Sequence, residues 1–205
     1  MTGVQTCALP IYDITIDNNV LYNERKIVHG VDLGALPVKN LLVKYSRNVL
    51  VYGNTFADSY SIVQDSADGT VRLKNNVFQN ELLSVEDPAD VGPGELDHNV
   101  YNKATDAIAW GGTFYPSRAA FHAAVPAMET FGKDGDPKLN AFPSPSLQPG
   151  SAAIDMGADL GSPYSTDING TSRPQGTAWD AGAYESPFSV GDKTPPAAPR
   201  RFRLQ

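Results

Sequence analysis

Acidic and basic side chains gather near the N-terminal end of the chain, and this is the first place where the sequence could support catalysis. A glycoside hydrolase needs two carboxylates about 5–10 Å apart, and Glu24 with Asp32 or Asp65 could supply them. His29 and Lys44 are further catalytic candidates in the same region. Loops on a rigid scaffold often carry functional sites, but a solvated loop face explains these residues without chemistry.

Arg72 and Lys74 form a second candidate pair, separated by one residue as two outward positions of a β-strand are. Either base could act in catalysis. Glu95 and Asp97 occupy the same two columns of an internal repeat. If the two segments are neighbouring strands, each base faces an acid, and such cross-strand ion pairs contribute about 0.2–1 kcal/mol each. The pattern favours this ladder of ion pairs over catalysis.

Two further sets of residues could bind ligands. Tyr52 and Tyr60 could stack on sugar rings, because an aromatic ring offers a flat apolar face. Asp155 and Asp167 could ligate Ca²⁺, since hard oxygen ligands suit that ion. The surrounding segment lacks the regular Asp spacing of a calcium loop, so capping of turns is the alternative role. No motif specifies a cofactor, which leaves Ca²⁺ as the single candidate.

An internal repeat must position these side chains. Its anchors are four asparagines with alternating apolar residues before them: Asn19, Asn54, Asn76 and Asn99. The last two intervals are nearly equal and the first is longer, which we interpret as a loop insertion around residues 32–40. We expect each asparagine to adopt the left-handed conformation of a sharp bend and to hydrogen-bond its counterpart one strand away.

The apolar residues of the repeat align in columns that we expect to point inward. The columns are Ile14, Val49 and Val71; Ile16, Val51, Leu73 and Leu96; and, beyond the asparagine, Leu21, Phe56, Phe78 and Tyr101. A second strand is predicted after each bend, over residues 26–33, 61–66, 82–87 and 107–112. Two strands and a bend in every repeat are typical of a coil in a solenoid.

The asparagine blocks, especially NNVF and GNTF, resemble the right-handed parallel β-helix proteins of the pectate-lyase-like superfamily over residues 12–110. The resemblance implies an all-β fold with parallel β-helix coils at residues 12–112. It also implies a polysaccharide partner and a secreted or cell-surface location of bacterial type. Lyases of this superfamily use an Arg or Lys as base and often Ca²⁺ to neutralise a uronate, which is the role the resemblance implies for Arg72 and Lys74.

Two functions stay open, because the superfamily includes enzymes and non-enzymatic proteins. The first is a fragment of a secreted polysaccharide lyase or glycoside hydrolase whose catalytic coils lie upstream, so that the fragment alone is inactive. The alternative is a non-enzymatic cell-surface or adhesin-like β-helix that binds carbohydrate. We expect a monomer in either case.

The repeat ends near residue 112, and a lid is predicted after it. Ser117 can cap a short helix from Arg118 to about Val125, which we expect to cover the last coil. The segments SLQPGSAAIDMGADLG, TDINGTSRP and DAGAYE resemble the C-terminal segment of secreted bacterial β-helix proteins. We therefore assign residues 113–188 to the capping helix and a Gly/Pro/Asp-rich C-terminal cap. Ile154, Ile168 and Tyr184 are expected to close its core.

The two ends of the chain carry different signals. Residues 1–11 resemble the translation of a sequencing adapter and contain Cys7, the chain's single cysteine, so we exclude them and expect the natural chain to begin upstream. Residues 189–205 begin as a Pro-rich linker and then resemble the first strand of a fibronectin type III domain.

Composition excludes two classes of partner. The net charge is −7 and the 16 Lys and Arg residues are scattered, which argues against nucleic-acid binding, since that needs clustered positive charge. No apolar run approaches the roughly 20 residues of a membrane span.

Overall fold

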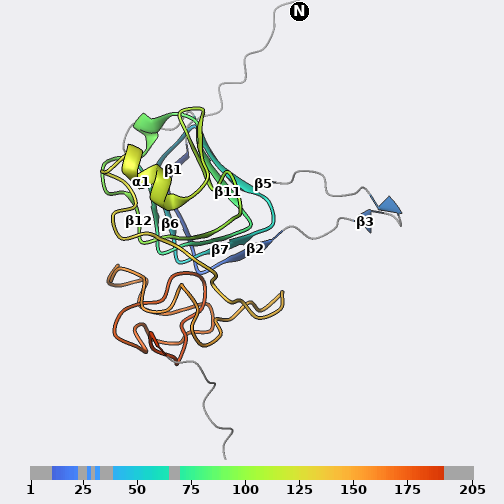
Figure 1. Cartoon of the computed structure of the whole chain (residues 1–205), viewed down its shortest axis with the longest axis vertical. Helices are drawn as coiled ribbons and strands as arrows, with labels where there is room; N and C mark the ends of the chain where they lie inside the picture. Colours follow the sequence, from blue (N-terminus) through green and yellow to red (C-terminus); the bar gives the residue numbers. More distant parts are fainter. Residues whose placement is uncertain (1–10, 23–26, 29–30, 33–38, 65–69, 192–205) are drawn as a thin grey trace, which may run out of the picture.

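The computed structural model describes residues 11–22, 27–28, 31–32, 39–64 and 70–191. This part of the chain is predominantly β, with three sheets whose strands are mostly parallel and one short α-helix (Figure 1). The predicted adapter segment lies outside the described residues except for Ile11, which begins β1.

The three sheets have the following members. The first sheet contains β1 (Ile11–Asp17), β6 (Ser46–Tyr52), β9 (Val71–Lys74) and β12 (Leu96–Asp97), in that order. The second contains β16 (Lys133–Asp134), β13 (Val100–Asn102), β10 (Val77–Gln79), β7 (Thr55–Ala57) and β2 (Val20–Tyr22). The third contains β15 (Thr113–Tyr115), β14 (Ile108–Trp110), β11 (Leu82–Val85), β8 (Tyr60–Gln64) and β5 (Lys39–Lys44).

The chain visits the three sheets in rotation. β6, β7 and β8 are followed by β9, β10 and β11 and then by β12, β13 and β14, and each strand pairs in parallel with its counterpart one round earlier. A 3-10 turn, η1 (Pro88–Asp90), lies between β11 and β12. The residues beyond each asparagine thus form a strand of their own, so a round contains three strands where the sequence pattern predicted two.

The predicted inward columns are confirmed by the strand register. Ile14 pairs with Val49, and Val49 pairs with Val71. Because side chains alternate between the two faces of a strand, these apolar residues all lie on the inward face. The column beyond the bend joins Leu21, Phe56, Phe78 and Tyr101 in register. Its rings stack at centroid distances of 5.3 Å between Phe56 and Phe78 and 5.0 Å between Phe78 and Tyr101. All three rings are buried in one continuous core.

The four asparagines are joined in a row by hydrogen bonds, which we call the asparagine ladder. Each Nδ2 donates to the Oδ1 of the next asparagine: Asn19 to Asn54 at 3.2 Å, Asn54 to Asn76 at 3.1 Å and Asn76 to Asn99 at 3.0 Å. The backbone N–H of each donor asparagine bonds the same oxygen. The ladder therefore satisfies polar groups that the packed bend removes from water.

The left-handed conformation falls one residue before each ladder asparagine, which corrects the sequence prediction. The residues with positive φ are Asn18 (51°), Gly53 (60°), Asn75 (59°) and His98 (57°). Asn, Gly and His are among the residue types that tolerate this region. The chain turns at the preceding residue, and the ladder asparagine is then free to direct its amide inward.

The predicted strand at residues 26–33 is wrong. Its described parts, β3 (Ile27–Val28) and β4 (Val31–Asp32), pair with one another in an antiparallel hairpin. The strand that pairs in parallel with β8 is β5, further along the chain. Apolar residues that flank His-Gly suit a hairpin as well as a solenoid strand, so the local pattern did not settle the pairing.

Residues 113–134 cover all three sheets at one end. β15 pairs antiparallel with β14, the N–H of Glu129 donates to the carbonyl of Leu96 in β12, and β16 pairs with β13. The predicted helix is confirmed as α1 (Arg118–Ala124), with Ser117 as its N-cap. α1 buries Phe121 in the core, and this seven-residue helix, the one α-helix in the described part, cannot cross a membrane.

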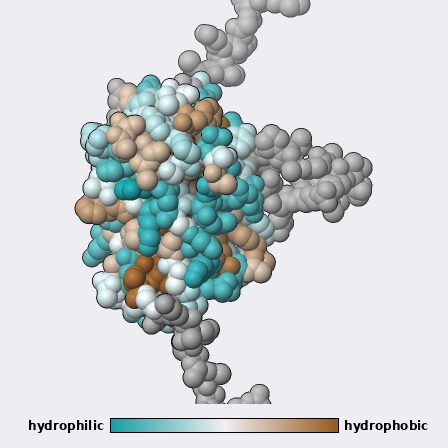
Figure 2. All heavy atoms as spheres, in the orientation of Figure 1, coloured by the Kyte–Doolittle hydropathy of each residue, from teal (hydrophilic) through white to brown (hydrophobic). Residues whose placement is uncertain are grey.

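The segment after residue 135 forms a second core against the second sheet. Val77 and Val100 pack there with Ile154 and Ala181, and Tyr184 is also buried. Ile168 is 43% exposed, so its predicted core position is wrong. The reason is that its neighbour Asp167 turns inward to accept backbone N–H groups, which leaves the isoleucine on the outer side. Figure 2 shows a mostly hydrophilic surface with small separate apolar patches.

Candidate functional site

Side chains of the first sheet, together with the residue just before β12, form a polar group that we call the basic cluster: Tyr52, Arg72, Lys74 and Glu95. Leu50, the residue opposite Arg72, and Tyr52, the residue opposite Lys74, lie on β6. Alternation along β9 places Val71 and Leu73 in the core and the two bases outside. The same alternation therefore fixes both the scaffold and the charged face.

Both bases of the cluster contact one carboxylate. Glu95 Oε2 lies 3.4 Å from Arg72 Nε and 3.1 Å from Lys74 Nζ. The predicted Arg72–Glu95 pair is thus confirmed, whereas the predicted Lys74–Asp97 pair is wrong. Asp97 Oδ1 instead accepts the N–H groups of His98 and Phe131. Two cations therefore share one carboxylate, and Asp97, the register neighbour of Lys74, lies beside them.

Exposure and burial set what this cluster can do. The side chains of Arg72 and Lys74 are 45% and 24% exposed, so both reach solvent. Tyr52 is buried, and burial raises the pKa of its phenol although Arg72 opposes the rise. The phenol stays protonated at neutral pH. The arrangement suits recognition of a carboxylate by a guanidinium and an ammonium more than proton abstraction by either base.

His98 lies beside the basic cluster, a relationship that the sequence did not predict. Its Nδ1 is 3.8 Å from Asp97 Oδ2, and its ring stacks on Phe131 at a centroid distance of 5.0 Å. Burial lowers the pKa of His98, Asp97 opposes this and Lys74 adds to it. The imidazole is therefore neutral at neutral pH. The signal that could have found it is its position just before a ladder asparagine, at the sharp bend.

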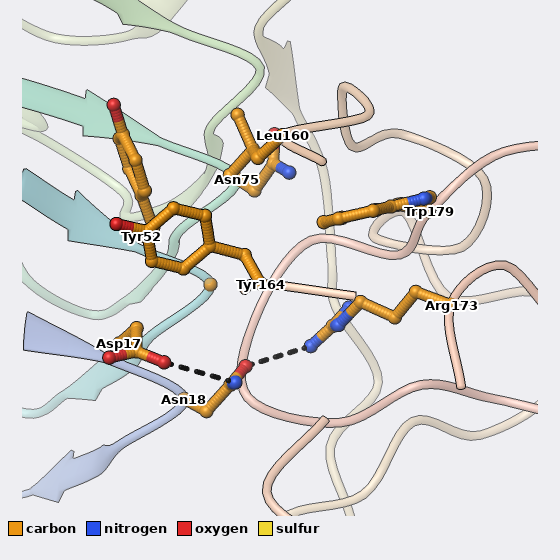
Figure 3. A pocket seen from close by; sticks show the side chains of 9 residues that line it. Asp17, Asn18, Tyr52, Asn75, Leu160, Tyr164, Arg173 and Trp179 are labelled. Carbon is orange, nitrogen blue, oxygen red and sulfur yellow. Dashed lines mark hydrogen bonds between the residues drawn. The ribbon is translucent and has the colours of Figure 1, made fainter. Parts of the chain in front are cut away.

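A cavity between the first sheet and the C-terminal segment is a contact, not a ligand site. Figure 3 shows Tyr52 and Tyr164 turned toward one another and Arg173 reaching Asn18. The two tyrosine rings meet edge to face at 5.2 Å. The free volume is about 10 Å³, which is the space of roughly one water molecule. Tyr52 is covered by this contact and is not open to stack on a sugar.

Arg173 holds this contact together from inside. Its Nη1 donates to Asp180 O and Glu185 Oε2, and its Nη2 donates to Gly182 O and, at 3.3 Å, to Asn18 Oδ1. Burial lowers the pKa of Arg173 and raises that of Glu185, while the attraction between them opposes both changes. Burial also raises the pKa of Asp180 to about 7. This network is structural.

Of the other predicted catalytic candidates, Lys44 is the one whose side chain the structure describes, and it lies on the third sheet, away from the cluster. Glu24, His29 and Asp65 lie outside the described residues, and Asp32 is described only as part of β4. Lys44 ends β5 in the third sheet, with its Nζ 4.8 Å from the centroid of the Tyr45 ring. Among the catalytic candidates whose side chains the structure describes, it brings together Arg72 and Lys74. Tyr60, the other predicted sugar-stacking residue, begins β8 in the third sheet and is half-buried.

The proposed calcium ligands are occupied by backbone donors. Asp155 accepts the N–H groups of Thr177, Ala178 and Val190. These bonds lower the pKa of Asp155 against the opposing effect of burial. Asp167 accepts three N–H groups in the same way. In the part of the chain that the structure describes, no three His, Cys, Asp or Glu side chains are grouped to hold a metal ion, and turn capping accounts for both aspartates.

Two deeply buried carboxylates also have internal partners. Glu81 accepts from Ser59 N, Ser61 Oγ and Asn40 Nδ2, and burial raises its pKa to about 7. Glu129 lies at the end of the asparagine ladder, and burial raises its pKa to about 8. Because each side chain is enclosed and bonded, neither is available to a substrate.

A groove that the sequence did not predict runs between the second sheet and the segment that follows β16. Its volume is about 430 Å³. Most of its lining is polar, and the residues are Asp58, Gln79, Asp136, Lys138, Leu139, Asn140, Phe142 and Gln148. We call it the second-sheet groove. No motif marks it, because its two walls are far apart in sequence.

Comparison with protein families, with curated proteins and with solved structures gives no match to the chain. The interpretation of the molecule therefore depends on its residues and its geometry. The features that bear on function are the asparagine ladder, the basic cluster and the second-sheet groove.

Proposed function

We propose that the three sheets are coils of a right-handed parallel β-helix of the pectate-lyase-like superfamily, and that the protein is an extracellular, polysaccharide-binding one. The support is the rotation of the chain through three parallel sheets together with the asparagine ladder. In this proposal residues 189–205 lead into a fibronectin type III module. A polysaccharide fits such a scaffold because an extended sheet face can contact several sugar units in a row.

We propose the basic cluster as the contact for an acidic polysaccharide. The observation that carries this is the sharing of Glu95 by Arg72 and Lys74, since both bases still reach solvent. A uronate carboxylate would pair with the planar guanidinium of Arg72, whose side chain is 45% exposed. Because the whole chain has a net charge of −7, a polyanion has to be attracted locally by this cluster.

The cluster supports binding without turnover by this chain. Both bases are engaged by Glu95 and Tyr52 is covered by Tyr164. In the enzymatic version of the proposal, lyase or hydrolase chemistry belongs to coils upstream. The ion pairing of both bases favours the alternative of a non-enzymatic, adhesin-like protein for the coils described.

Affinity electrophoresis in gels that contain polygalacturonate or alginate tests the proposal. We expect both polymers to retard the protein at low salt and the Arg72→Ala/Lys74→Ala variant to lose about tenfold or more in affinity. Lys133→Ala is the matched control, because Lys133 is an exposed base on β16, away from the cluster. Equal retardation of all three proteins, or none of the wild type, contradicts acidic-polysaccharide binding. Unsaturated products or new reducing ends would contradict the absence of turnover.

A further inference from the structure

The second-sheet groove has the size of a ligand site and is separate from the basic cluster. Its volume of about 430 Å³ lies within the roughly 300–1,000 Å³ of small-molecule sites. Asp58 and Gln79 come from the ends of the β7 and β10 segments, whereas Asp136, Asn140 and Gln148 come from the chain after β16. The basic cluster lies on the first sheet, so the two features use different faces of the molecule.

Several polar side chains of the groove are oriented by a hydrogen bond to one of their two polar atoms. Asn102 Nδ2 donates to Gln79 Oε1 at 2.9 Å and Asn80 Nδ2 donates to Asp58 Oδ1 at 3.1 Å. On the other wall, Asn140 Nδ2 donates to Ser146 Oγ and Gln148 Nε2 donates to Leu139 O. These bonds orient the side chains before any ligand binds, which reduces the entropy cost of binding.

The opposite ends of these side chains remain available. Within the described residues, Gln79 Nε2 and Lys138 Nζ have no hydrogen-bond acceptor, and the second carboxylate oxygens of Asp58 and Asp136 have no donor. The lining therefore offers both unused donors and unused acceptors to a ligand. A hydroxyl group both donates and accepts, so a ligand with many hydroxyls matches this lining.

The apolar and charged residues of the groove further limit the class of ligand that fits it. Phe142 lines the groove, and its ring is held by Tyr22 at a centroid distance of 4.5 Å. A fixed aromatic ring offers a flat surface for the apolar face of a sugar. Asp58 and Asp136 outnumber Lys138, so the groove has a net negative charge and repels polyanions. The chemistry selects an uncharged sugar over an acidic one.

We infer that the second-sheet groove binds a neutral oligosaccharide, independently of acidic-polysaccharide binding by the basic cluster. A neutral ligand here and an acidic ligand on the first sheet would let one molecule contact two kinds of glycan or two regions of one glycan. Each interaction has its own residues, so each can fail without the other.

Affinity electrophoresis with galactan, xylan and glucomannan tests the inference on the full chain. We expect at least one of these neutral polymers to retard the wild type, and retardation to be insensitive to salt because no ion pair is formed. Gln79→Glu keeps the acceptor for Asn102 and replaces the free donor by an acceptor, so it should weaken binding about tenfold or more. Phe142→Ala should have a similar effect.

Matched variants separate this site from the rest of the protein. Phe131→Ala removes an exposed aromatic ring that lies against His98, outside the groove, and should change affinity less than about twofold. Arg72→Ala/Lys74→Ala should also bind neutral polymers normally. If Phe142→Ala does not fold by circular dichroism, the isosteric Gln79→Glu decides. Failure of all three neutral polymers to bind, or unchanged binding by Gln79→Glu, overturns the inference even if polygalacturonate binds.

Discussion

Glu129 takes the place of a fifth rung beyond Asn99 in the asparagine ladder. Its Oε1 accepts from Asn99 Nδ2 at 2.7 Å and its Oε2 lies 3.4 Å from Asn99 N, as each asparagine oxygen receives the two N–H groups of the rung before it. Tyr101 OH donates to the same carboxylate at 2.7 Å. One residue thus ends both the ladder and the aromatic column, because Tyr101 is the last ring of that column.

The middle of the ladder should be the most sensitive part of the fold to polar truncation. Asn76→Ala removes the acceptor for Asn54 N and Nδ2 and the donor for Val51 O, all of them buried. We expect a loss of about 3 kcal/mol in the free energy of unfolding, measured by urea denaturation. Asn169→Ala, at an exposed turn, is the control and should cost about 0.5 kcal/mol or less. Equal losses would show that the ladder does not stabilise the bend.

Stability should fall as pH rises through the neutral range. The pKa of Glu129 is raised from 4.5 to about 8 in the folded state, so the folded protein binds a proton more tightly than the unfolded chain. Its stabilising effect is full below about pH 4.5 and is lost as pH rises through about 8, with a slope of at most about 1.4 kcal/mol per pH unit. Glu81, with a pKa of about 7, adds to the trend.

Glu129→Gln tests the origin of that pH dependence. The variant keeps the shape of the side chain and cannot ionise, so urea denaturation at several pH values should give a flatter profile between pH 5 and pH 8 than the wild type. Glu129→Ala, which also removes the acceptor for Tyr101, should instead destabilise at every pH. A profile in Glu129→Gln as steep as that of the wild type would assign the effect to other groups.

Removing the buried guanidinium should detach the C-terminal segment from the sheets. Arg173→Met leaves Glu185 buried without its partner, and breaking a buried ion pair in this way costs about 3–5 kcal/mol. We expect a matching loss of stability and faster proteolysis after residue 135. Arg173→Met/Glu185→Gln should recover part of the loss, because no unpaired charge remains. Lys133→Ala, at an exposed base, should stay within about 0.5 kcal/mol of the wild type.

Alanine substitutions at two glycines with positive φ should distinguish the cost of backbone strain from the cost of a packing clash. Gly182 (φ +95°) has room for no side chain, since an added Cβ would lie 2.9 Å from Thr55 Oγ1 and 3.0 Å from Val77 Cγ2. Gly170 (φ +79°) has no atom within 4 Å of that position. Gly170→Ala should cost about 1 kcal/mol from strain alone. Gly182→Ala should cost about 3 kcal/mol in urea denaturation, and equal costs would exclude the packing contribution.

The inward columns could be predicted from sequence because each position repeats the same chemistry. Ile16, Val51 and Leu73 occupy one column, and a shift of one residue would expose all of them, so the register has a single good solution. The bend was less certain, since Asn75 and Asn76 are chemically identical neighbours and the pattern does not say which takes positive φ. The structure shows that the first residue does.

Features that depend on docking could not be predicted in this way. Asp58 and Asn140 line one groove, although Asp58 lies within the repeat and Asn140 lies after its end. No local periodicity in the sequence relates the two residues. Lys74 contacts Glu95 in place of Asp97, because the Asp97 carboxylate accepts the backbone N–H groups of His98 and Phe131. Phe131 belongs to residues 113–134, which cover that end of the sheets. Long-range placement, rather than strand propensity, decided both outcomes.

The antiparallel direction of β15 has a consequence for self-association. The other neighbouring strands in the third sheet pair in parallel. If the last strand were also parallel, its free edge would offer an incoming strand the same hydrogen-bond pattern as the strands inside the sheet. β15 replaces the evenly spaced, slanted bonds of a parallel edge by the alternating spacing of an antiparallel one. A molecule that meets this edge encounters a different hydrogen-bond spacing from the one between the parallel strands inside, and this mismatch opposes in-register extension of the third sheet.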